Sequence, residues 1–144
     1  MKKAEFYLLS LTWGLLHTLL GIIAAVVLLC AGYKPKMWGG CFHFEVGENW
    51  GGVSLGLVFI TSKNPTPRTK NHEHGHAIQN CFFGPMFWFV VAIPSIIRYW
   101  YIVARLTLGY KYGKRYDSIW FEGQATELGT FVVEQWNKER NNEK

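Results

Sequence analysis

The sequence predicts an α+β protein with an N-terminal transmembrane helix. Three patterns indicate this fold class: a long uncharged run at the start of the chain, a stretch in which apolar residues alternate with others, and two segments with helical spacing. We divide the 144 residues into a membrane anchor, residues 1–36, and one domain, residues 37–144, which includes a membrane-associated insertion at residues 82–108.

The run between Phe6 and Tyr33 contains no charged residue. It is longer than the roughly 20 apolar residues that a spanning helix needs, and longer than the core of a cleavable signal peptide, so we expect a retained transmembrane helix. His17 lies inside this run. It either marks a polar site within the membrane or faces the remaining protein, and the second interpretation is favoured.

Composition favours a lipid bilayer over nucleic acid as a partner. The net charge is +5, but the basic residues are scattered and 49% of the chain is hydrophobic. Most basic residues follow the anchor, which favours the cytoplasmic side for the domain under the positive-inside rule. The cysteines, Cys30, Cys41 and Cys81, have no paired spacing, which argues against a disulfide framework.

Residues 41–61 predict a β-hairpin. The segment Cys41–Val46 alternates, residues 47–52 are rich in turn formers, and Val53–Thr61 is mostly apolar. We expect Val53–Thr61 to be an edge strand that binds an extended substrate by strand addition through Val53, Leu55 and Leu57. An equally weighted alternative is that this strand only packs under the next helix.

The stretch Asn71–Asn80 contains the motif His-Glu-x-x-His, formed by His72, Glu73 and His76. Thr69 or Asn71 can cap a helix here, and positions four apart share one helix face, so the two imidazoles can bind one zinc ion. Glu73 is then placed to take a proton from a water molecule. Gln79 and Asn80 follow on the metal face, where they can hydrogen-bond the ligands or substrate or only satisfy the helix end. The alternative is a solvated helix with three histidines.

The insertion is not expected to cross a bilayer. Phe82–Ile97 is uncharged but contains Pro85 and Pro94, and at about 1.5 Å per residue it is shorter than a hydrocarbon core of about 30 Å. A single crossing would also separate His72 and His76 from any ligand that follows. We therefore expect residues 82–108 to enter and return, or to lie in the interface as two helices broken at Pro94.

A second helix is predicted from Asp117 or Ser118 to about Trp136. Glu122 shares one face of it with Ala125 and Gly129. A carboxylate on an apolar face of small residues is costly unless it is paired or binds a metal, so Glu122 is favoured as the third ligand over Glu127. The alternative is a solvent-exposed Glu122 that the helix dipole stabilises.

These residues resemble the gluzincin metallopeptidases, in particular integral-membrane ones such as the CAAX prenyl proteases and the bacterial heat-shock membrane protease, in which His-Glu-x-x-His is followed by Glu-x-x-Ala-Asp. The chain is also similar to small uncharacterised bacterial proteins with a His-Glu-x-Gly-His-x-x-Gln stretch. The resemblance implies a zincin-like domain with Zn²⁺ held by His72, His76 and Glu122, and with Glu73 as general base. Thr126 stands where the family has an Asp that orients a ligand histidine.

The sequence therefore predicts a membrane-anchored zinc metallopeptidase that hydrolyses peptide or protein substrates. One alternative is a catalytically silent membrane protein that keeps this scaffold to bind a partner. Another is a small membrane protein in which the histidine cluster is incidental.

Overall fold

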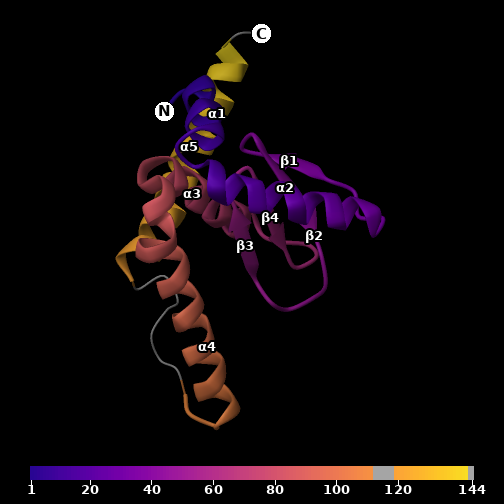
Figure 1. Ribbon diagram of the computed structural model, residues 1–144, viewed down its shortest axis with the longest axis vertical. Helices are drawn as coiled ribbons and strands as arrows, with labels where there is room; N and C mark the ends of the chain where they lie inside the picture. Colours follow the sequence, from indigo (N-terminus) through magenta and orange to yellow (C-terminus); the bar gives the residue numbers. More distant parts are fainter. Residues whose placement is uncertain (112–118, 143–144) are drawn as a thin grey trace.

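The computed structural model describes residues 1–111 and 119–142 and confirms the α+β class, with α-helices beside a small mixed sheet (Figure 1). Its α-helices are α1 (Lys3–Leu11), α2 (Leu15–Cys30), α3 (Pro67–Phe83), α4 (Ile93–Thr107) and α5 (Trp120–Asn142). Its strands are β1 (Lys36–Trp38), β2 (Cys41–Glu45), β3 (Gly52–Leu55) and β4 (Val58–Thr61). Two short turns of helix, η1 (Gly84–Met86) and η2 (Trp88–Ala92), connect α3 to α4.

The sheet differs from the expected hairpin. Its strand order is β1-β2-β4-β3, with β2 and β4 parallel, so Cys41–Val46 and Val53–Thr61 do not form an antiparallel pair. Val53–Thr61 instead folds back on itself as the β3–β4 hairpin. Gly56 permits this turn because its φ is +66°, and Thr18 packs where a side chain would project. The first half of the predicted edge strand, β3, does lie at a sheet edge.

The predicted single N-terminal helix is wrong, because α1 and α2 meet at 89°. The bend is held by a contact with α3: the Asn80 side-chain amide donates a hydrogen bond to the Gly14 carbonyl oxygen, 3.1 Å away. On α2, Gly21 lies against the Leu55 carbonyl, so this helix packs closely on the sheet. The small residues of α2 face the sheet, and its large apolar residues face outward. One uncharged run can therefore pack on the protein with one face and expose an apolar surface with the other. His17 faces the protein and is 3% exposed.

The insertion also differs from expectation. Trp88–Thr107 is a continuous helix that is long and apolar enough to cross a membrane, and it extends away from the other elements (Figure 1). The break expected at Pro94 is absent: the helix continues through this proline, which follows the π-helical turn η2. The chain is nevertheless back at the base of this helix by Glu122, whose carboxylate accepts a hydrogen bond from Ser95.

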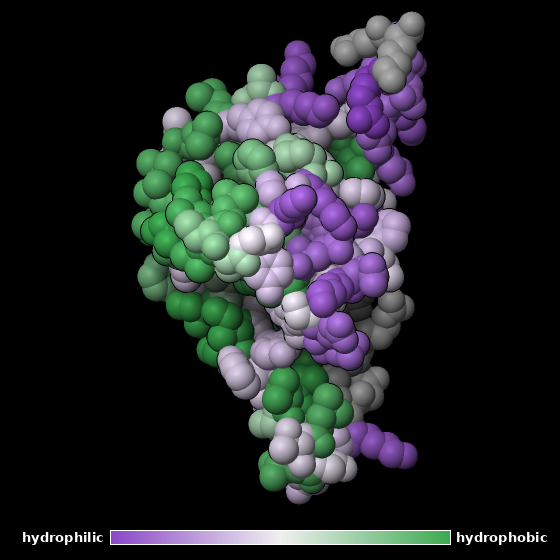
Figure 2. Space-filling view, turned by 90° about the vertical axis from the view of Figure 1, so that its right-hand side faces the viewer, coloured by the Kyte–Doolittle hydropathy of each residue, from purple (hydrophilic) through white to green (hydrophobic). Residues whose placement is uncertain are grey.

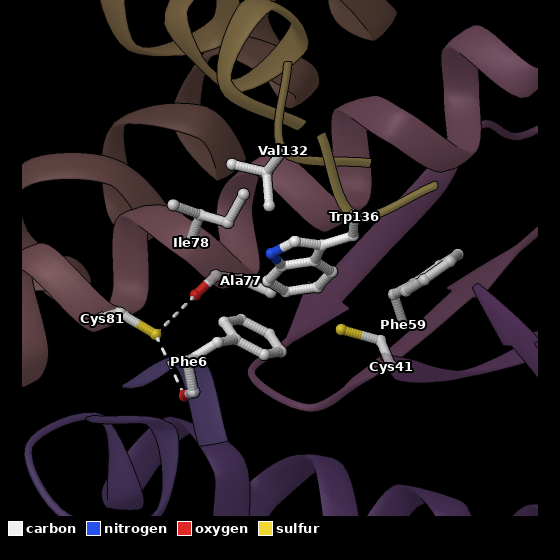
Figure 3. Close-up of a cluster of buried hydrophobic side chains, with 8 residues drawn as sticks. All are labelled: Phe6, Cys41, Phe59, Ala77, Ile78, Cys81, Val132 and Trp136. Carbon is white, nitrogen blue, oxygen red and sulfur yellow. Dashed lines mark hydrogen bonds between the residues drawn. The ribbon is translucent and has the colours of Figure 1, made fainter. Parts of the chain in front are cut away.

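The core lies where α3 is enclosed by α1, α5 and the sheet. Figure 3 shows Phe6, Phe59 and Trp136, contributed by three different elements, around Ala77 of α3. The helices α3 and α5 approach so closely that a Cβ on Gly75 would collide with the Ala125 carbonyl, and one on Gly129 with the Asn71 carbonyl. This contact between small residues sets the first turns of α5 directly against the His-Glu-x-x-His turn of α3.

Candidate metal centre

The two motif histidines lie one turn apart on α3. The N-cap of this helix is Thr66, not Thr69 or Asn71: its hydroxyl accepts a hydrogen bond from the Thr69 backbone N–H, and Pro67 occupies the first helical position. The helix is therefore well established before it reaches His72. Positions four apart then direct both imidazoles toward α5.

Glu122 in the first turn of α5 completes a three-residue cluster. The His72 and His76 Nε2 atoms lie 3.1 and 3.3 Å from Glu122 Oε2, and 3.2 Å from each other. Four bonds of about 2.0–2.1 Å in a tetrahedron place ligand atoms about 3.3 Å apart, so these separations fit one face of a zinc-sized tetrahedron. The three residues can hold a metal ion.

The hydrogen bonds behind the imidazoles fix which nitrogen carries the proton. The Thr126 hydroxyl donates to the Glu122 carbonyl, so it accepts from His72 Nδ1, 2.9 Å away. His76 Nδ1 lies 2.8 Å from the Gln79 side-chain oxygen, which can only accept. Gln79 is itself oriented by donating to the Phe121 carbonyl and to Gln124. Both histidines therefore present an Nε2 lone pair to Glu122.

Three lone pairs that face one another this closely repel unless a cation lies between them. Glu122 Oε2 is buried against the two imidazoles, and among the described residues no other donor reaches it, whereas Oε1 accepts from Ser95. Burial acts to raise the pKa of the Glu122 carboxyl, but contacts with His72 and His76 and the Ser95 hydrogen bond lower it below its usual range. Burial likewise opposes a charge on His76, yet Glu122 and Glu73 raise its pKa above the usual value. The site therefore favours positive charge.

Glu73 lies in the same cavity as the cluster. Burial raises the pKa of its carboxyl, although the nearby His76 and His72 act in the opposite direction. The carboxylate packs against the backbone of Gly52, where an added Cβ would lie 2.5 Å from Oε1. Glu73 is thereby held between the cluster and the edge strand β3.

The cavity beside the cluster measures about 840 Å³. Its walls come from β3, the base of α4 and the motif turn of α3. Val53 and Leu55, two of the residues expected to bind substrate, line this cavity. Leu57 does not, because it follows the Gly56 turn and packs against the main core instead.

Of the supporting residues expected from the sequence, two lie at the cluster and one does not. Thr126 and Gln79 each hydrogen-bond a ligand histidine. Asn80 lies elsewhere, on Gly14 at the α1–α2 bend. Sequence reasoning missed Ser95, which holds the Glu122 carboxylate, because no local pattern reveals that the base of α4 lies beside α5.

Comparison with known proteins finds no family model, no curated protein and no solved structure that matches this chain.

Proposed function

We propose that this chain is a membrane-associated, zinc-dependent metallopeptidase of the gluzincin kind. The observation that supports it most strongly is the convergence of two Nε2 lone pairs and one carboxylate oxygen within 3.1–3.3 Å of one another. Two imidazoles and a carboxylate are a common ligand set of catalytic zinc, which leaves the fourth position open for water or substrate. Octahedral ions that prefer oxygen ligands fit this donor set less well.

Glu73 is the proposed general base and acid. His72, His76 and Glu122 would hold the zinc ion, which would supply Lewis-acid polarisation of the scissile carbonyl and lower the pKa of a water molecule toward neutral pH. Glu73 accepts the proton of that water molecule on its carboxylate and then donates it to the departing amine nitrogen, so the proton balance of the hydrolysis closes. Burial, which raises its pKa, brings the carboxyl closer to the pH at which such exchange is efficient.

The edge strand gives the site a means of holding a peptide. β3 pairs with β4 on one side only, and it borders the cavity that contains Glu73. Backbone groups on a free edge can pair with an extended peptide, which is a general mode of peptide recognition. We therefore propose peptide or protein substrates.

A lipid bilayer is the proposed environment. Trp88–Thr107 could span it, and the outer faces of α2 and α4 expose large apolar residues such as Ile23, Val27, Ile97 and Trp100. Figure 2 shows that apolar residues gather on one side of the molecule and hydrophilic ones on the opposite side. A single crossing by Trp88–Thr107 would separate Glu122 from His72 and His76, yet Glu122 accepts a hydrogen bond from Ser95 at the base of α4. We therefore propose that this helix enters the bilayer without separating the two halves of the site, and that both lie on one side, for which the positive-inside rule favours the cytoplasm.

Metal analysis and one variant test this function. Protein purified in detergent micelles is expected to contain one zinc per chain and to cleave peptides, while Glu73→Gln keeps the zinc and loses turnover. The control is Glu48→Gln, an exposed carboxyl outside the site, which should retain both. Zinc without turnover in the parent protein would instead indicate a silent binding scaffold, and absence of stoichiometric metal would reject the metal centre itself.

A further inference from the structure

His17 belongs to the wall of the metal-site cavity, although it comes from α2 near the start of the chain. Its ring centre lies 4.7 Å from that of Phe87 and 5.2 Å from that of Trp88. The Phe87 ring is also packed against His76, at 6.4 Å between centres. The N-terminal helix pair therefore does more than contact lipid: it contributes a polar side chain to the site.

One hydrogen bond determines what this imidazole can offer. His17 Nε2 lies 3.0 Å from the Ser54 carbonyl oxygen, which can only accept, so Nε2 carries a hydrogen. The neutral ring then has its lone pair on Nδ1. Among the described residues, Nδ1 has no hydrogen-bond partner, and neither does the Ser54 hydroxyl, although both are buried. Buried acceptors without a donor are rare and need a reason.

The free edge of β3 supplies that reason. In an antiparallel pair, alternate residues direct their backbone groups toward the partner strand and away from it. Beside the β3–β4 hairpin the Ser62 N–H donates to the Gly51 carbonyl, so by this alternation Gly52 and Ser54 direct their backbone groups to the free edge, where His17 donates to the Ser54 carbonyl. A peptide added to this edge cannot donate to the Ser54 carbonyl, because the imidazole already does. His17 Nδ1, on the same ring, is an acceptor without a described partner, in the wall of the cavity that β3 borders.

We propose that His17 is a substrate-positioning residue, whose Nδ1 accepts a hydrogen bond from a backbone N–H of a peptide extended along the free edge of β3. This inference rests on the proposed peptidase function, and it assigns the ligand class as an extended peptide backbone. The imidazole nitrogen then accepts the peptide N–H in place of the Ser54 carbonyl, which is already bonded by the same ring. The residue thereby fixes the register of the peptide relative to Glu73.

Peptide hydroxamates with single N-methyl groups test the proposal directly. The probe is a fluorescent peptide hydroxamate with Leu and Phe side chains, bound to zinc-loaded protein in detergent micelles, and a series in which each backbone N–H in turn is N-methylated. At one position, N-methylation should weaken binding to the parent protein roughly five- to tenfold, the value of one hydrogen bond. In His17→Phe, which keeps an aromatic ring against Phe87 and Trp88, the same N-methyl group should cause no further loss.

Two conservative variants separate positioning from a purely structural role. In His17→Asn, the side-chain oxygen can occupy the place of Nδ1, while the donor to Ser54 is lost. In His17→Gln, the amide can reach the Ser54 carbonyl, but no acceptor remains at Nδ1. The proposal expects His17→Asn to bind the peptide more tightly than His17→Gln. A role limited to holding the Ser54 carbonyl predicts the opposite order, and that result would overturn the proposal.

The remaining outcomes are also decisive. N-methyl effects that are the same in the parent protein and in His17→Phe at every position would reject the role of His17. Failure of the zinc-loaded parent to bind any of the hydroxamates would reject it too. Zinc content and cleavage, measured on the same preparations, keep the proposed function separate: binding with His17-dependent N-methyl effects but without cleavage would support His17 and reject the peptidase.

Discussion

His72 Nδ1 lies 2.9 Å from the Thr126 hydroxyl, which connects the motif helix to α5 across the metal centre. Because Thr126 donates its own hydrogen to the Glu122 carbonyl, it can only accept from His72. The Thr126 hydroxyl therefore sets the tautomer of His72 while it contacts the backbone of Glu122. A partner of this kind makes the imidazole a better ligand by fixing its orientation and proton.

The first prediction concerns this hydroxyl. Thr126→Val keeps the shape of the side chain but removes the acceptor, so His72 loses the partner that fixes its Nε2 lone pair. Zinc affinity, measured by competition with a chromophoric chelator, should fall by about 10- to 100-fold. Thr130→Val is the matched control, because Thr130 lies one turn further along α5 and contacts Asn71 instead of a ligand. Equal affinities of Thr126→Val and the parent would contradict the assignment.

The second prediction is that zinc links the stability of α3 to that of α5. A ligand that binds only the folded state stabilises it by about 4 kcal/mol at a thousand times its Kd, so a chelator should lower the Tm of the parent protein clearly. In Glu122→Gln the chelator should shift the Tm much less, because the third ligand is gone. Glu127→Gln, an exposed carboxyl on the same helix, should keep the full shift. A chelator-independent Tm in the parent would be incompatible with a metal centre between these helices.

The third prediction uses the contact between Gly52 and Glu73. In Gly52→Ala the new methyl group would lie 2.5 Å from Glu73 Oε1, so the carboxylate must move away from its place beside the cluster. Turnover should fall by at least an order of magnitude, since catalysis depends on the placement of the base to within an ångström. Zinc content should not change, because the three atoms nearest to the new methyl group all belong to Glu73 and not to His72, His76 or Glu122.

A double variant checks that the effect passes through Glu73. Gly52→Ala combined with Glu73→Gln should be no less active than Glu73→Gln alone, because a displaced base and a missing base are the same defect. Additive losses would show that Gly52 acts on the substrate edge independently of Glu73.

The residues of the candidate metal centre can be predicted from the sequence because their relationship is local. His72 and His76 lie four residues apart on one helix, and this spacing fixes their common direction without any tertiary information. Glu122 was identified by its position on a face of small residues, and the structure places that face, through Ala125 and Gly129, against α3. The site could thus be assembled from two helical patterns, each readable over a few turns.

The elements that differ from expectation depend on contacts between distant residues. The 89° bend in the N-terminal run is supported by Asn80, which is 66 residues away from Gly14. An uncharged run has the same composition whether its outer face meets lipid or its inner face meets a sheet, so hydropathy alone could not reveal the bend. The parallel β2–β4 pair likewise depends on the Gly56 turn and its contact with Thr18.

The last prediction concerns acid stability and His43, which is far from the metal ligands in sequence and packs in the sheet. Its ring stacks on Phe59, with centres 4.6 Å apart, and its Nε2 lies 2.8 Å from the Thr61 hydroxyl. That hydroxyl donates to the Ser62 carbonyl, so His43 must be the donor. Burial lowers the pKa of His43 to about 4; nearby Glu45 opposes this shift, and Lys70 and Lys36 reinforce it.

The sign of the effect follows from this shift. The unfolded chain takes up a proton at His43 near pH 6.5, whereas the folded protein resists it until about pH 4, so stability is present above pH 6.5 and is lost as the pH falls toward 4. One proton contributes at most about 1.4 kcal/mol per pH unit.

His43→Phe keeps the ring stack on Phe59 but cannot bind a proton. Its free energy of unfolding, measured in detergent from pH 7.5 to 4, should therefore fall less steeply than that of the parent. His74, whose pKa burial also lowers to about 4, is present in both proteins and cancels in the difference. Parallel curves would mean that His43 is protonated equally in the folded and unfolded chains.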